Sequence, residues 1–158
     1  MSEEMNVIRA HHVYKTICSV LDERSWNYKT DEDNLTVLFG GIGEDLPIHF
    51  ILMVDIERQL IRLLSPLTFE VNPDKMVEEA IACCVASNKM VDGGFDFDLE
   101  ETLISFRMTA SFRNSKIGAD LLEYMIDCSL AMVDRYNDKF DAINKGELDI
   151  AEFVSDET

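Results

Sequence analysis

The run of residues 88–107, NKMVDGGFDFDLEETLISFR, constrains the fold of this chain more than any other segment. A helical pattern ends at Asn88, two glycines follow, and phenylalanines then alternate with acidic residues. This change of the hydrophobic period from about 3.6 residues to two predicts the passage from a helix into an antiparallel hairpin. The phenylalanines of that hairpin would face the core, while Asp96 and Asp98 project from the opposite face beside Arg107.

Periodicities in the rest of the chain predict an α+β fold, an antiparallel sheet with helices packed against it. Apolar residues three or four positions apart indicate helices over about 6–23, 73–89 and 117–145. With the hairpin, strands at about 26–30, 35–39, 47–54 and 58–64 give the order α-β-β-β-β-α-β-β-α. The length favours a single domain over residues 1–158, with a core at about 6–146 and a short acidic tail at 147–158 in which one turn docks.

Two predicted elements carry expectations about buried surfaces. The strand at 47–54 has apolar residues on both faces, because Ile51 and Met53 point away from its other apolar residues. Such a strand is central and covered on both sides, or it lies beneath an interface. The helix over 73–89, with Asn72 as its expected N-cap, is predicted to turn an apolar stripe toward the core. That stripe consists of Val77, Ala80, Ile81, Cys84 and Val85.

The charge of the chain is strongly negative, with 14 basic residues against 31 acidic ones and a net charge of −17. Such a surface repels the phosphate backbone of nucleic acids and anionic membranes, so neither is expected as a partner. The charge either serves solubility or favours partners that are basic or that expose apolar surface. No apolar run approaches the roughly 20 residues of a membrane helix, and the first residues lack a signal-peptide pattern, which predicts a cytoplasmic protein.

No motif predicts catalysis, a metal site or a cofactor. The glycines within 40–43 follow a strand as a phosphate-binding loop would, but no Lys-Ser/Thr pair or helix follows, so a hairpin turn is expected. Residues 141–152 match a calcium loop only in part, because Ile143 and Lys145 occupy two of its ligand places. The four cysteines form no C-x-x-C pair, and His49 belongs to no nucleophile or metal motif. The sequence therefore predicts a protein that is not an enzyme.

Several short segments occur along the chain in a characteristic order. They are LSPL at 64–67, ASN at 86–88, GFDFD at 94–98, ISFR at 104–107, MVDRY at 132–136 and INKG at 143–146. In this order the chain resembles the YbjN-domain family, described as bacterial sensory-transduction regulators, over about residues 19–153. The resemblance implies a fold like that of type III secretion chaperones, a group of small, acidic, frequently dimeric proteins that bind other polypeptides. It supplies no catalytic residues, and fold alone does not decide function.

Two functional hypotheses follow from these observations. The first is a non-enzymatic module with a regulatory or chaperone-like role, which binds a protein or peptide partner or a second copy of the chain as a homodimer. Its expected partner-binding residues are Ile51, Met53, Asp96, Asp98 and Arg107, together with the free edge of the sheet, to which an extended peptide can add. The alternative is a small-molecule sensor with a pocket between the long C-terminal helix and the sheet. That pocket would be lined by Phe95, Phe97, Met125 and Met132.

Overall fold

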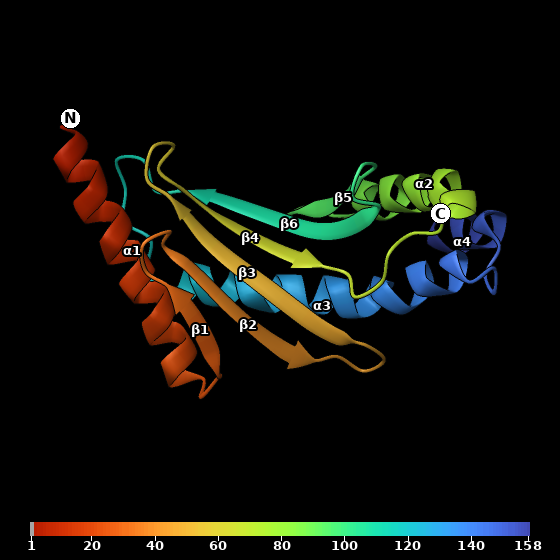
Figure 1. The fold of residues 1–158 in the computed structure, drawn as a ribbon, viewed down its shortest axis with the longest axis horizontal. Coiled ribbons are helices and arrows are strands. Elements are labelled where there is room, and N and C mark those ends of the chain that lie inside the picture. Colours follow the sequence, from red (N-terminus) through yellow and green to blue (C-terminus); the bar gives the residue numbers. More distant parts are fainter. Residues whose placement is uncertain (1) are drawn as a thin grey trace.

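A computed structural model describes residues 2–158, and their helices and strands follow the order α-β-β-β-β-α-β-β-α with one further helix at the end (Figure 1). The first half contains α1 (Glu3–Glu23), β1 (Tyr28–Asp31), β2 (Thr36–Ile42), β3 (Pro47–Asp55) and β4 (Leu60–Pro66). The second half contains the 3₁₀ helix η1 (Pro73–Lys75), α2 (Met76–Asn88), β5 (Gly94–Asp98), β6 (Leu103–Ser111), α3 (Ala119–Asn144) and α4 (Ile150–Glu157). The predicted α+β class is confirmed.

The six strands form one antiparallel sheet in the order β1-β2-β3-β4-β6-β5, which makes β3 and β4 its central strands. Helices α1 and α3 pack against one face of this sheet, and α2 and α4 lie together at the β5 end (Figure 1). The 26 residues of α3 extend for about 39 Å at 1.5 Å per residue. This length lets α3 cross the sheet and continue to the end where α2 and α4 lie.

The core lies between the sheet and α1 and α3, and it continues as a cluster of aromatic rings at the β5 end. The ring centroid of Phe95 lies 4.9 Å from that of Phe140 and 5.7 Å from that of Tyr136. Phe153 of α4 lies 6.0 Å from Phe140 and is 1% exposed. The docked turn predicted in the acidic tail is therefore a helix of 8 residues.

The 88–107 run folds as its change of period predicts. Helix α2 ends at Asn88, and β5 and β6 pair so that Phe95 lies opposite Phe106. Between helix and strand, Gly93 has a φ of +73°, and a Cβ atom there would lie 2.6 Å from the Phe106 ring. Only glycine fits this position, because the backbone conformation is left-handed and the space beside it is already filled.

One local expectation needs a shift and another is wrong. A hairpin turn joins β2 to β3 as predicted, but it lies at residues 43–46, and Gly40 and Gly41 continue β2. The Asn72 side chain does not cap the helix that follows it. Instead its Nδ2 donates to the carbonyl of Asn144 at 2.9 Å, and its backbone N–H donates to Asn144 Oδ1 at 2.7 Å. Asn72 thereby ties the loop before α2 to the end of α3.

Candidate functional site

The face of the sheet turned away from α1 and α3 carries no helix within residues 2–158, and we call it the open face. Side chains alternate along each strand, so the cross-strand register shows which of them share this face. One row consists of Lys29, Leu38, Ile51, Leu64 and Arg107, and the next of Thr36, Met53, Arg62 and Thr109. By the same alternation His49, Pro66 and Asp96 also lie on the open face.

Apolar side chains occupy the middle of the open face. Leu38 is 44% exposed, and Ile51, Met53, Leu64 and Pro66 are half-buried. A shallow hollow of about 580 Å³ lies at the β1–β3 side of this row, where Leu38, His49 and Ile51 are among the residues that line it. Contiguous exposed apolar side chains framed by polar ones are typical of binding surfaces.

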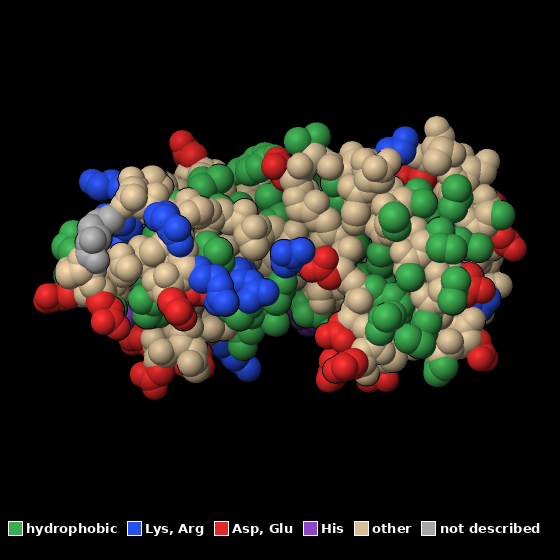
Figure 2. Space-filling model, turned by 90° about the horizontal axis from the view of Figure 1, so that it is seen from above, with side chains coloured by type: hydrophobic (Ala, Val, Ile, Leu, Met, Phe, Trp, Pro, Cys, Tyr) green, Lys and Arg blue, Asp and Glu red, His purple; other side chains and the backbone are tan. Residues whose placement is uncertain are grey.

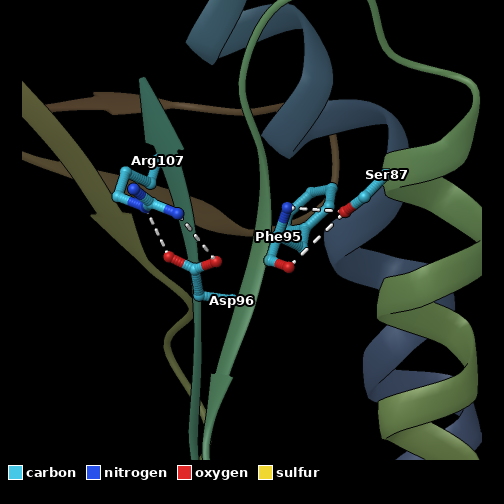
Figure 3. A network of polar contacts seen from close by, with 4 residues as sticks. All are labelled: Ser87, Phe95, Asp96 and Arg107. Atoms are coloured by element: carbon cyan, nitrogen blue, oxygen red, sulfur yellow. Dashed lines mark hydrogen bonds and ion pairs between the residues drawn. The ribbon is translucent and has the colours of Figure 1, made fainter. Parts of the chain in front are cut away.

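By this alternation all five predicted partner-binding residues, Ile51, Met53, Asp96, Asp98 and Arg107, lie on the open face, with Asp98 at the end of β5. Arg107 Nε donates to Asp96 Oδ2 at 2.6 Å, and Arg107 Nη2 donates to Asp96 Oδ1 at 3.3 Å (Figure 3). The hydrogen bonding and charge of Asp96 hold the pKa of Arg107 above its ordinary value, so the guanidinium stays charged. Asp98 has a different role, because its Oδ1 accepts the backbone N–H groups of Glu100 and Glu101, each at 3.0 Å, and closes the β5–β6 turn.

The two edges of the sheet differ in their access. At the β5 edge, α2 lies beside the strand, and the backbone N–H of Phe95 donates to the Ser87 hydroxyl at 2.8 Å (Figure 3). An added strand would have to displace α2 from this edge. At the opposite edge, β1 makes no main-chain hydrogen bond beyond its pairing with β2 in the described part of the chain. The free edge that the sequence predicts is therefore β1.

The orientation predicted for α2 is wrong for four of its five stripe residues, and only Val85 is half-buried against the core. Val77 is 71% exposed and Ile81 is 42% exposed, and Ala80 and Cys84 are exposed as well. We call these four residues the α2 stripe. The residues that face the core instead are Glu79, Ala82, Cys83 and Ala86. Small side chains on that side let α2 approach β5 and α4 closely, which larger Val and Ile side chains would prevent.

The α2 stripe forms one wall of a shallow groove of about 490 Å³ that Met76 and Leu99 complete. Figure 2 shows hydrophobic side chains gathered at the end of the molecule where α2 lies, with acidic side chains beside them. The α2 stripe is thus a second exposed apolar surface, separate from the open face.

Inside the same helix, Glu79 is fully buried, and neither of its carboxylate oxygens has a hydrogen-bond partner. Burial, together with the nearby charges of Asp141 and Glu78, raises the pKa of Glu79 to about 8, so the carboxyl is mostly protonated at neutral pH. One turn later, burial raises the pKa of the Cys83 thiol to about 12, which leaves it protonated. The thiol is therefore a poor nucleophile.

Side chains fill the space predicted to hold a small-molecule pocket between α3 and the sheet. Phe95 and Met125 are 6% and 1% exposed and belong to the core. Met132 is half-buried and lines a separate hollow of about 220 Å³ together with Cys128 and Tyr136. Within residues 2–158 no group of three or more His, Cys, Asp or Glu side chains is placed to hold a metal ion. None of the described helices is long and apolar enough to cross a membrane.

Three residues of the open face escaped the sequence prediction. Leu38 and Leu64 each lie between inward-facing neighbours on their strands. The same period-two alternation that placed Ile51 and Met53 on the second face of the sheet could therefore have placed these two leucines there. Arg62 carries no such signal, because an exposed arginine on a strand is ordinary and its neighbours depend on the pairing of β4 with β6.

Comparisons with known proteins agree with this architecture. The YbjN family model, described as "Putative bacterial sensory transduction regulator", matches residues 14–142. No curated protein sequence matches the chain. Among solved structures, YbjN from E. coli superposes with a TM-score of 0.59 at 10% identity, over 81% of this chain and 89% of that one.

Two further solved structures come from complexes. A chain of the ExsC–ExsE complex has a TM-score of 0.56 at 10% identity, over 80% of this chain and 94% of that one. A chain of the HopA1–SchA chaperone–effector complex has a TM-score of 0.53 at 14% identity, over 77% of this chain and 88% of that one. At such low identities these likenesses show the fold alone, that of type III secretion chaperones. The family model spans most of the chain, and the protein therefore belongs to the YbjN family.

Proposed function

We propose that this protein is a non-enzymatic binding module with a regulatory or chaperone-like role, and that it binds a partner polypeptide on its open face. The observation that carries the proposal is the apolar row of Leu38, Ile51 and Leu64 on a sheet face that no described helix covers. Each such side chain contributes about 25 cal/mol for every Å² that a partner removes from water.

Two observations support a polypeptide as the partner. The unpaired β1 edge adjoins the apolar row through β2, so an extended segment could pair with β1 and lay side chains across the row. A chain of similar fold occurs in a chaperone–effector complex. We propose that the module comprises residues 1–158 and acts in the cytoplasm, and that its net charge of −17 keeps it from nucleic acids and anionic membranes.

Affinity purification under native conditions, with wild type and Met53→Asp compared, tests the proposal. Met53 is half-buried on the open face, so the new carboxylate stays in water and disturbs the contact rather than the core. Ile8→Asp is the matched control, because it makes the same chemical change at a residue of α1 that is 58% exposed.

A partner of the open face is captured by wild type and Ile8→Asp and lost with Met53→Asp. The purified partner should then bind Met53→Asp at least tenfold more weakly and should slow amide exchange in β2, β3 and β4. Equal binding to all three proteins would show that the open face is not the binding surface.

For the homodimer we propose the α2 stripe as the contact. A two-fold contact places the same patch of both copies together, which suits a stripe without charged side chains and does not suit a face that carries several arginines. Sedimentation equilibrium should then show a dimer for wild type and Met53→Asp and a monomer for Val77→Asp. A monomeric wild type would refute this contact.

Small-molecule sensing is the second candidate function, favoured by the apolar hollow of about 580 Å³ beside Leu38 and Ile51. A ligand of this hollow raises the melting temperature of wild type by mass action, and Ile51→Asp should abolish that shift. A screen of metabolites in which no compound stabilises the wild type would count against sensing.

A further inference from the structure

In a chain whose net charge is −17, three arginines lie close together on the open face. Three arginines, Arg58, Arg62 and Arg107, line a depression of about 410 Å³ together with Asp55, Leu60 and Thr109. Figure 2 shows several Lys and Arg side chains close together near the middle of the molecule, with acidic side chains beside them. We call this depression the arginine depression.

The three guanidinium groups differ in their partners. Arg58 Nη1 donates to Asp55 Oδ2 at 3.1 Å, and Arg107 is held by Asp96 at 2.6 Å. Arg62 is exposed and makes no hydrogen bond or ion pair with any residue of the 2–158 range. Asp55 and Asp96 thus pair with two of the three arginines, and Arg62 has no carboxylate partner. Arg62 lies in the middle of the sheet, in register between Met53 and Thr109.

We infer that the arginine depression binds a carboxylate of an extended partner segment, which lies along β4 and rests an apolar side chain on Leu64. The inference rests on the proposed function and names the chemistry of its partner: an acidic segment in which Asp or Glu alternates with apolar residues. The planar guanidinium of Arg62 offers parallel N–H donors that fit both oxygens of one carboxylate.

The spacing of the face fits such a segment. Arg62 and Leu64 lie two residues apart on β4 and on the same side of it, which places them about 6.7 Å apart along the strand. In an extended peptide, side chains two positions apart are separated by the same distance and point the same way. One peptide side can therefore place an apolar group on Leu64 and a carboxylate on Arg62.

The net charge argues against a small free anion as the occupant. A free anion gains only one exposed ion pair, worth at most about 1 kcal/mol, and it approaches a molecule of charge −17. A polypeptide adds the burial of apolar side chains, which offsets that repulsion. Screening over about 8 Å at physiological ionic strength further confines the repulsion to nearby charges.

Two synthetic peptides test the inference by isothermal titration calorimetry. The first peptide repeats the unit Ser-Leu-Ser-Glu, and the second repeats the unit Ser-Leu-Ser-Gln. They differ only in the charge of the side chain that would meet Arg62. Wild type should bind the glutamate peptide about fivefold more tightly, the factor that corresponds to about 1 kcal/mol. Arg62→Gln should bind both peptides equally and weakly. Together, Arg62→Gln in the protein and glutamate-to-glutamine in the peptide form a double-mutant cycle that isolates the contribution of the ion pair.

Lys15→Gln is the control, because it removes one positive charge from an exposed position on α1. It should retain the preference for the glutamate peptide. Equal binding of both peptides to wild type, with both lost in Met53→Asp, would overturn the inference and leave the proposed function standing. Binding of neither peptide, or binding that survives Met53→Asp, would overturn both. Inorganic phosphate that competes fully with the glutamate peptide would show a simple anion site instead.

Discussion

Replacing Glu79 by glutamine should stabilise the protein by an amount that grows with pH. Burial, helped by the charges of Asp141 and Glu78, raises the pKa of Glu79 from 4.5 to about 8 in the folded protein. In the unfolded chain the carboxyl ionises at its ordinary pKa. Between these two values the folded state holds a proton that the unfolded state has released, so the free energy of unfolding falls as the pH rises.

The size of the effect follows from the width of that pH window. Each unit of pH between the two pKa values costs about 1.4 kcal/mol. Wild type should therefore lose about 3 kcal/mol between pH 4.5 and pH 7, and about 5 kcal/mol once the pH exceeds 8. Glutamine has nearly the same volume and does not ionise. The variant should match wild type at pH 4 and exceed its free energy of unfolding by about 3 kcal/mol at pH 7.

Urea denaturation at pH 4, 7 and 9 measures this difference, with a reductant present for the four free cysteines. The single tryptophan, half-buried Trp26 beside Phe39, provides the fluorescence signal. Glu78→Gln is the matched control, because this neighbouring carboxyl is half-buried and its loss should change stability by less than about 0.5 kcal/mol. A difference between Glu79→Gln and wild type that stays constant with pH, or a variant less stable at pH 7, would refute the reasoning.

Other substitutions test the α2 orientation, the closed β5 edge and the turn glycines. Val77→Ser should change the free energy of unfolding of the monomer by less than about 0.5 kcal/mol because Val77 is exposed in the single chain, whereas Ala82→Leu should cost about 1–3 kcal/mol in a buried position; urea denaturation, at a protein concentration too low for dimers, that gave the reverse ranking would restore the inward stripe. Ser87→Ala should cost about 1–3 kcal/mol and speed hydrogen exchange of the β5 amide that Ser87 accepts; an unchanged exchange rate would show that α2 does not close that edge. Gly93→Ala should lower the melting temperature more than Gly146→Ala does, because both have positive φ but only Gly93 has atoms within 3 Å of a new Cβ; equal losses at the two glycines would contradict the steric clash.

Local patterns predicted the hairpin correctly because its structure depends on neighbouring residues. Alternation of period two placed Phe95 toward the core and Asp96 on the other face, and pairing within the hairpin brought Asp96 to Arg107. The same alternation placed Ile51 and Met53 on the second face of β3. These assignments need only the pleat of a strand.

The orientation of α2 could not be read in this way. Residues Val77 and Ile81 have the spacing of a core stripe, but periodicity shows only that a helix has an apolar side. The other side holds Ala82 and Ala86, and close packing against β5 and α4 selects these smaller residues for the interior. The arginine depression was equally hidden, because Arg62 and Arg107 are brought together by the pairing of β4 with β6, across an intervening helix and strand.

The contact between Ser87 and β5 has a consequence for how copies of this protein can associate. A fibre built by strand addition needs two available sheet edges on every molecule, because each molecule must pair with the one before it and with the one after it. This sheet offers β1 alone, because α2 occupies the other edge. Edge-to-edge growth therefore stops after two molecules, and the protein can leave an apolar sheet face in solvent without forming the open-ended polymers that such a face would otherwise promote.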